Sequence, residues 1–210
     1  MLLPILTLAT RSDKTAVYNE LVGAYKARAA DLNERYLDGK ITRNTWKNAM
    51  RDEVRTLHVQ AYAAGKSGGW DSITQAEWGS VGARLRTQYQ FLDRFADEIV
   101  VRDFSLAQMN QRTGLYGNAS WASFEAAIAA EKGVPASGLP AFPADGTSEC
   151  RSNCRCSWAI RKRRGSHFCT WRLGRADHCE TCRKRSKSWI NLELRNGVLV
   201  TPFEPIFYNP

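Results

Sequence analysis

The sequence lacks cysteine until position 150, although it holds six cysteines among its 210 residues. It also lacks a long apolar run: residues 1–10 are apolar, but a helix that crosses a bilayer needs about 20 such residues. The same stretch lacks the basic start of a signal peptide, and Pro4 would interrupt a helix there. We therefore expect residues 1–11 to form an arm that packs on this protein or on a neighbour. We also expect the thiols to be made in a reducing cytoplasm.

Catalytic motifs are missing as well. The glycines of residues 65–69 resemble a phosphate loop only superficially, because no strand-to-helix turn surrounds them. Asp177 and His178 lie beside a Cys-x-x-Cys, as in HNH-type nucleases, but no second histidine or asparagine follows at helical spacing. No metalloprotease motif, triad order or nucleotide fingerprint is visible. We expect no enzyme, and a metal-dependent nuclease is the least favoured class of function.

The positive charge is concentrated in one segment. Residues 150–187 hold 12 Lys and Arg against two acids, whereas the rest of the chain holds 18 basic and 19 acidic residues. Such a segment suits nucleic-acid phosphates, and it equally suits an acidic surface of a protein partner. Charge alone does not decide between the two.

Apolar residues spaced three or four apart predict helices in the first two thirds of the chain. The predicted helices are residues 12–38, a segment that starts after the cap Thr42, one that starts at the capping box 74–77, and one from Ser105 to Ile128. His58 lies beside an apolar helix face, where a lone histidine indicates packing rather than ligation. Residues 12–132 are therefore expected to form a helical bundle.

The last third of the chain reads as a connector, a β module and a tail. Residues 133–149 are rich in proline and glycine and should be extended. In the module, residues 150–200, we expect one hairpin turning at Arg164-Gly165, with Trp158 facing Trp171, and a second hairpin over residues 189–200 turning at Asn196-Gly197. Residues 201–210 should be an extended tail whose aromatics, Phe203, Phe207 and Tyr208, anchor on a neighbouring chain. The alternative is that the tail folds back over the chain's own helices. The fold class is therefore α+β.

The cysteine pattern indicates a metal site. Cys179 and Cys182 have the two-residue spacing that lets both sulfurs face one tetrahedral ion. Cys150, Cys154 and Cys156 can supply the opposite pair across a small sheet. We expect zinc, because a module this small needs a metal to stabilise it. Disulfides in a secreted domain and unligated thiols are the alternatives, and Cys169 is expected to be unligated in any case.

Several segments resemble a known family. They are Gln111-Arg-Thr-Gly-Leu-Tyr116 and the run from Leu139-Pro-Ala-Phe-Pro-Ala-Asp-Gly to Cys150-Arg-Ser-Asn-Cys-Arg-Cys156. In this order after a helical region, they resemble the minor head proteins of tailed bacteriophages, the Mu F-like head-morphogenesis family. Asn153-Cys-Arg-Cys156 is the most specific match, since that family often carries His-Pro-x-Cys-Arg-Cys near a Cys-x-x-Cys. This chain differs in having Cys150 where a histidine is common, one residue further away, and in having its Cys-x-x-Cys after the Cys-x-Cys. It is also short for the family.

The resemblance implies a structural or assembly protein of the virion, made in the host cytoplasm. Such a protein would lie in the head or near the portal, as a connector component that docks on neighbouring capsid or portal subunits, and would have no catalytic role. The alternative is a zinc-stabilised nucleic-acid-binding module that contacts DNA through residues 150–187. Base stacking could then use the interleaved aromatics Trp158, Phe168, Trp171 and Trp189, although we favour the hairpin core as their place.

Overall fold

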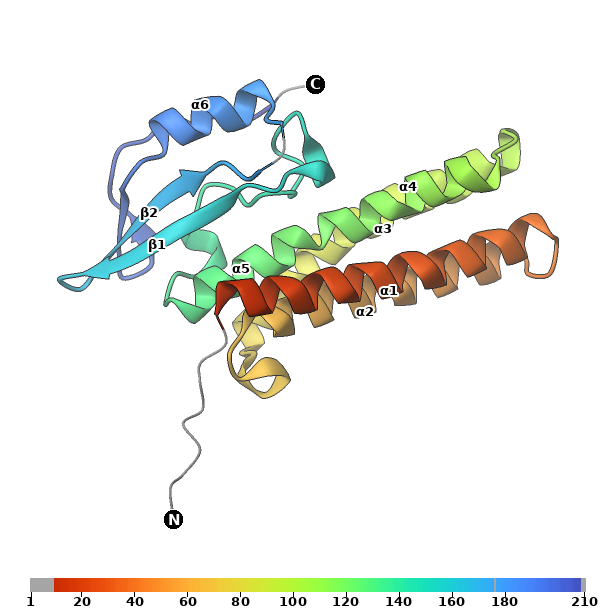
Figure 1. Cartoon of the computed structure of the whole chain (residues 1–210), viewed down its shortest axis with the longest axis horizontal. Helices are drawn as coiled ribbons and strands as arrows, with labels where there is room; N and C mark the ends of the chain where they lie inside the picture. Colours follow the sequence, from red (N-terminus) through yellow and green to blue (C-terminus); the bar gives the residue numbers. More distant parts are fainter. Residues whose placement is uncertain (1–9, 176, 209–210) are drawn as a thin grey trace, which may run out of the picture.

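The computed structural model describes residues 10–175 and 177–208. It consists of a long helical body and a smaller module of sheet and helix packed at one end of that body (Figure 1). The α+β class predicted from the sequence is confirmed. The arm expected at residues 1–11 lies almost wholly outside the described residues, apart from Thr10 and Arg11. Among the helices that the structure describes, none is long and apolar enough to cross a membrane.

Five helices form the body, and polar caps set where four of them begin. They are α1 (Arg11–Leu37), α2 (Arg43–Gly65), α3 (Gln75–Val101), α4 (Leu106–Ala119) and α5 (Trp121–Glu131). The hydroxyls of Thr42, Thr74 and Ser105 each accept a backbone N–H of the first turn, as the sequence predicts. Thr10 caps α1 in the same way.

The body is held by packing around α2, together with a buried polar network. Trp46 of α2 donates from Nε1 to Asn33 Oδ1 of α1 at 2.9 Å, and Asn33 Nδ2 donates to Thr113 Oγ1 of α4 at 3.0 Å. His58 is buried in α2, with Nδ1 2.9 Å from Ser123 Oγ, and burial lowers the pKa of His58 to about 3. The imidazole is therefore neutral at physiological pH and packed in the core.

The predicted single helix from Ser105 to Ile128 is wrong, because the chain breaks at Ser120 into α4 and α5. The Ser120 hydroxyl donates to the Gly117 carbonyl at 2.7 Å, which ends α4. The break turns Trp121 toward the module, where its Nε1 donates to the Cys156 carbonyl at 3.0 Å. Gly117 is required by close packing, since a Cβ there would lie 2.9 Å from the Tyr25 ring.

The module contains an antiparallel sheet in the order β1-β2-β3-β4. The strands are β1 (Ser157–Arg163), β2 (Ser166–Arg172), β3 (Leu192–Arg195) and β4 (Val198–Leu199). The predicted turn at Arg164-Gly165 and the facing pair Trp158 and Trp171 are confirmed. Asn196-Gly197 also forms the predicted turn, with φ of 50° and 78°, the left-handed pair that a type I′ turn requires.

One element of the module was not predicted. Helix α6 (Glu180–Ser188) lies between the two hairpins, so the second hairpin is shorter than expected and Trp189 belongs to the end of α6. The connector also differs from the expected extended chain, because it contains the 3₁₀ turn Ala136–Gly138, and it buries Val134, Leu139 and Phe142. Its Ala141 carbonyl accepts the indole N–H of Trp158 at 2.9 Å. The connector is therefore part of the interface between body and module.

A single buried carboxylate, Glu125 of α5, joins three parts of the fold. It forms an ion pair with Arg11 at the start of α1 and accepts the backbone N–H of Trp158 of β1 at 3.3 Å. Burial raises the pKa of Glu125 to about 7, although Arg11 opposes the shift. Sequence analysis missed this residue, because a lone glutamate among alanines carries no pattern.

We predict that Glu125 gives folding stability a negative slope with pH. The unfolded carboxyl ionises near 4.5 and the folded one near 7, so between these values the folded state keeps a proton that the unfolded state has lost. The Glu125 contribution to the free energy of unfolding should therefore fall by up to about 3 kcal/mol as pH rises through this window.

The measurement is urea denaturation of the native chain and of Glu125→Gln at about pH 5 and about pH 8. His58 has the opposite slope, since its folded pKa is lowered, so the difference between the two proteins isolates the glutamate. Equal pH profiles for both proteins would show that Glu125 does not titrate in this window.

The C-terminal tail lies on the chain's own module. This differs from the expectation that its aromatics anchor on a neighbouring chain. Arg185 of α6 is buried and donates to the Ile206 carbonyl at 2.8 and 2.9 Å. Trp189 Nε1 donates to the Glu204 carbonyl at 3.0 Å, and the Phe203 ring packs edge-on against Trp189. Of the expected anchors, Phe207 is about half exposed (51%), which leaves its outer face free.

Removal of residues 203–210 should therefore destabilise the module, because the buried guanidinium of Arg185 loses its Ile206 acceptor. We expect the free energy of unfolding to fall by about 2–4 kcal/mol, measured by urea denaturation with tryptophan fluorescence. Phe207→Ser keeps the carbonyls in place and should cost less than about 1 kcal/mol. A truncated chain as stable as the full one would mean that the tail contributes nothing to the fold.

Candidate metal centre

Five of the six thiols converge where the β1 segment meets the start of α6. The Sγ of Cys182 lies 3.6 Å from that of Cys154 and 3.7 Å from that of Cys150. The Sγ of Cys179 lies 3.5 Å from that of Cys150. Cys156 lies beside this group, where Cys154 and Cys182 are close enough to shift the pKa of its thiol. The structure thus brings together all five cysteines that the sequence singles out.

Two short pieces of regular backbone aim these thiols at one point. Cys150 and Cys154 flank the 3₁₀ turn Arg151–Asn153, which reverses the chain so that both face the same way. Cys179 is the N-cap of α6 and Cys182 lies in its first turn, so this pair lies on a helix start. The two pieces are joined by Glu149, whose carboxylate accepts the backbone N–H of Glu180 at 3.1 Å and the Thr181 hydroxyl at 3.2 Å.

The sulfur geometry fits a tetrahedral ion. Zinc–sulfur bonds of about 2.3 Å at tetrahedral angles place neighbouring sulfurs about 3.8 Å apart. The separations of 3.5–3.7 Å are close to that edge and far longer than a disulfide bond of about 2.05 Å. The sulfurs of Cys150, Cys154 and Cys182 all lie within 4.8 Å of one another, and all six cysteines are free. The cluster can therefore hold a metal ion.

The fourth corner of such a site has two candidates, Cys156 and Cys179. Cys179 is half-buried beside Cys150. Cys156 is buried, and hydrogen bonds with the thiols of Cys154 and then Cys182 lower the pKa of Cys156 to about 4. His178 Nδ1 lies 3.9 Å from the Cys156 sulfur, and its Nε2 lies 3.2 Å from the Gly174 carbonyl. When Nε2 donates to that carbonyl, Nδ1 can accept a hydrogen bond from the Cys156 thiol.

A buried cation accompanies the thiols. The Arg185 guanidinium lies over the rings of Trp171 and Trp189, at 5.1 and 4.7 Å from their centres. Burial lowers the pKa of Arg185, and the charges that oppose this shift are those of Asp145 first and then of Cys182, Cys154 and Cys179. A divalent ion with four thiolates carries a net charge of about −2, and a buried arginine beside it offsets part of that charge. No sequence pattern pointed to this role of Arg185.

Cys169 lies apart from the cluster. It is buried in β2, opposite Ile160 of β1, and burial raises the pKa of its thiol to about 11. Its placement agrees with the expectation of an unligated thiol in the hydrophobic core.

Comparisons with known proteins give no family for this chain. No family model matches the sequence, no curated protein matches it, and no solved structure matches the fold. What the protein does must therefore be inferred from its own residues and geometry.

The centre makes a direct prediction about metal content. The purified chain should carry one divalent ion, and Cys154→Ser or Cys182→Ser should lose it, because each removes a sulfur from the central three. Cys169→Ser is the matched control and should keep the metal. Elemental analysis of protein purified without added metal or reducing-agent artefacts gives the stoichiometry.

Loss of the ion should unfold the module while leaving the body helical, since structural zinc supplies folding free energy on the order of 10 kcal/mol in small modules. Comparing Cys156→Ser with Cys179→Ser identifies the fourth ligand, because only the ligand variant should bind metal weakly. A folded, metal-free chain whose thiols are paired as disulfides would contradict the assignment.

Proposed function

We propose that this protein is a structural or assembly component of a tailed-phage virion, a minor head or portal-proximal connector protein. In this proposal a zinc ion bound by the cysteine cluster stabilises the module, and the module docks on neighbouring capsid or portal subunits. The observation that carries the proposal is the place of Asn153-Cys-Arg-Cys156, the most specific point of the family resemblance. Its two cysteines belong to the cluster that organises the module. The proposal includes no catalytic role.

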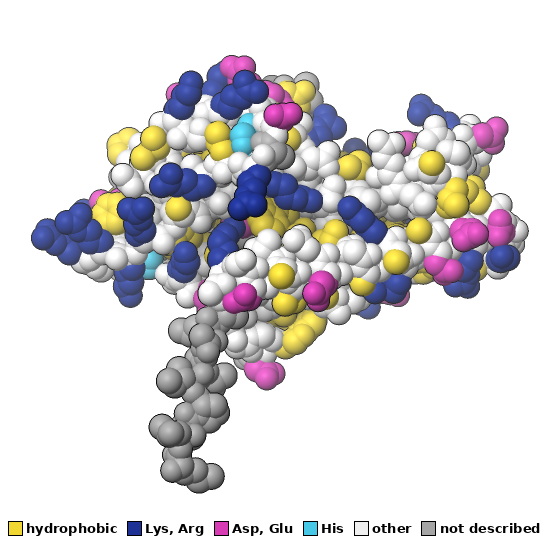
Figure 2. Space-filling view, in the orientation of Figure 1, with side chains coloured by type: hydrophobic (Ala, Val, Ile, Leu, Met, Phe, Trp, Pro, Cys, Tyr) yellow, Lys and Arg dark blue, Asp and Glu magenta, His cyan; other side chains and the backbone are white. Residues whose placement is uncertain are grey.

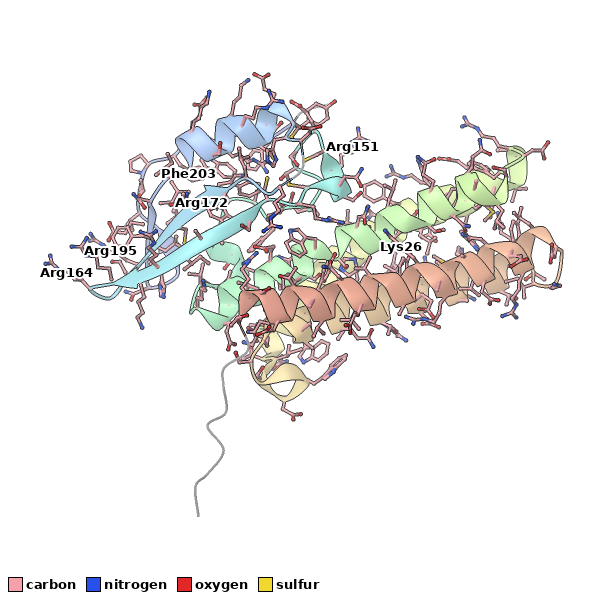
Figure 3. The ribbon with its side chains drawn as sticks, in the orientation of Figure 1. Lys26, Arg151, Arg164, Arg172, Arg195 and Phe203 are labelled. Atoms are coloured by element: carbon pink, nitrogen blue, oxygen red, sulfur yellow. The ribbon has the colours of Figure 1, made fainter. Side chains whose placement is uncertain are left out.

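The surface of the module supports docking through charge. Of the twelve basic residues in the segment 150–187, Arg185 is buried and Arg155 is half-buried, while the other ten are exposed. Figure 2 shows lysine and arginine side chains gathered over the β1–β2 hairpin, and Figure 3 places Arg164 at its tip. A basic protrusion of this kind steers toward an acidic surface and fixes orientation on it.

Nucleic-acid binding through residues 150–187 is the second candidate, favoured by the same ten cations. Its other support is weakened by the structure, because Trp158, Trp171 and Trp189 are buried and packed against one another. These rings form the module core, as favoured from the sequence, and cannot stack on bases. Only Phe168 of the four aromatics is partly accessible.

We predict that the chain is incorporated into phage particles and that incorporation depends on the hairpin tip. A variant in which serine replaces all four tip residues, Arg161, Lys162, Arg163 and Arg164, should be less abundant per particle by at least about tenfold. The reason is that the acidic surface of the partner loses its counter-charges. In the control variant, serine replaces four exposed cations of the body, Lys26, Arg35, Arg55 and Arg86, and this variant should be incorporated normally. Quantitative mass spectrometry of purified particles measures both.

The same variants distinguish the second candidate. Non-specific duplex DNA binding by the isolated chain should be weak and should fall with salt at a log–log slope of roughly −0.9 per phosphate contacted. Absence of the chain from particles, together with tight and sequence-selective DNA binding at physiological salt, would replace the virion assignment with the nucleic-acid one.

A further inference from the structure

The outward face of the sheet carries a hollow that neither the metal centre nor the core uses. Side chains alternate between the two faces of β1 and β2. Trp158 and Cys169 are buried on the inner face, while Ala159 and Arg161 of β1 and Phe168 and Thr170 of β2 line the hollow on the outer face. The hollow has a volume of about 510 Å³ and is closed at one side by the chain that follows α6. Cavities that hold ligands or peptide side chains in proteins have about this size.

The hollow has an apolar floor built from three separate segments. Phe168 comes from β2, Leu173 from the chain after it, and Ile190 from the chain after α6. Leu173 and Ile190 are 39% and 50% exposed, which is unusual for aliphatic residues that converge on one place. A contiguous exposed apolar patch with a polar rim is typical of an interaction site.

The rim of the hollow is positive. Arg161 of β1 and Arg172 of β2 both line it and are exposed, and no acidic residue is among the lining residues that the structure describes. Neither guanidinium has a carboxylate within ion-pair distance among residues 10–175 and 177–208. The nearest acid in register, Glu193 opposite Phe168, already pairs with Arg195 at 2.8 Å. Figure 3 labels Arg172 on the module, with Arg195 nearer the tip of the hairpin that carries Arg164.

From these features we infer that the hollow binds an acidic peptide segment that carries one large apolar side chain. The apolar side chain would rest on Phe168, Leu173 and Ile190, and flanking carboxylates would pair with Arg161 and Arg172. A central apolar anchor surrounded by charge is the usual arrangement of a small docking site. The inference rests on the proposed docking function and names the chemistry of the segment that the partner subunit presents.

A peptide suits the hollow better than single-stranded nucleic acid. Stacking of successive bases needs successive aromatic platforms. Two aromatic rings line the hollow, but Trp171 is only 1% exposed, which leaves Phe168 as the accessible ring. The two uncharged polar side chains of this edge, Thr170 and Asn191, are bonded to each other: Thr170 Oγ1 accepts the Asn191 backbone N–H at 3.0 Å and lies 3.3 Å from Asn191 Oδ1. Two aliphatic side chains beside one ring favour a leucine or phenylalanine as the occupant.

The experiment uses the full metal-loaded chain and a synthetic peptide with one central leucine between runs of glutamate. Fluorescence anisotropy at low salt should show binding that weakens at least about tenfold when glycine replaces the leucine, because a buried leucine contributes about 1.5–3 kcal/mol. Ile190→Ser should weaken binding of the leucine peptide to a similar degree. Arg172→Ser should weaken it about two- to fivefold through loss of one exposed ion pair.

Lys184→Ser is the matched control, because Lys184 lies on α6 about 200° around the helix from Ser186, which lines the hollow. It removes one exposed cation of the same module and should leave binding unchanged. If Lys184→Ser weakens binding as much as Arg172→Ser, the peptide responds to overall charge and the site is refuted. An oligothymidylate that binds more tightly than the peptide and depends on Phe168 would overturn the choice of ligand.

The outcome is separable from that of the virion proposal. Leucine-dependent peptide binding by a chain that is absent from particles supports the site and removes the virion assignment. If the chain is incorporated normally into particles but binds neither the leucine peptide nor its glycine variant, the site is refuted and the virion assignment remains.

Discussion

The convergence of five thiols on one point is the constraint on which the module depends. The sheet has only four strands, two of them short, and the basic side chains around it repel one another. A metal ion at the cluster would fix the 3₁₀ turn to the start of α6, and Glu149 already joins these two pieces by hydrogen bonds. Arg185 then connects the same centre to the tail, so the cluster, α6 and the last residues form one cooperative unit.

The body and module are coupled by a small set of polar contacts. Glu125 joins α1, α5 and β1, and Trp121 reaches from α5 to the Cys156 carbonyl next to the cluster. The break at Ser120 is what makes the second contact possible, because a continuous helix would carry Trp121 past the module. The orientation of the module on the body therefore depends on this one interruption of the helix.

Sequence patterns predicted the parts of this fold whose causes are local. Thr42, Thr74 and Ser105 mark helix starts because their hydroxyls satisfy nearby N–H groups, and Arg164-Gly165 and Asn196-Gly197 mark turns because those turns need left-handed backbone. The grouping of the five cysteines was likewise predictable from their spacing. Helix α6 was missed because its nine residues are mostly basic and polar. Glu125 and Arg185 were missed because their roles come from burial by residues distant in sequence, which no local pattern records.

The three tryptophans of the module also give it an optical signature of its own. Trp158, Trp171 and Trp189 have ring centres 5.2–5.9 Å apart, with one pair stacked and two pairs edge-on. Indole transitions at such separations couple as excitons and produce a circular dichroism couplet distinct from the helix signal. The helical body has a close indole pair of its own, Trp70 and Trp78, with ring centres 6.2 Å apart, which adds to the same signal. Replacing Trp78 by phenylalanine removes the contribution of the body, so that loss of the couplet then reports unfolding of the module.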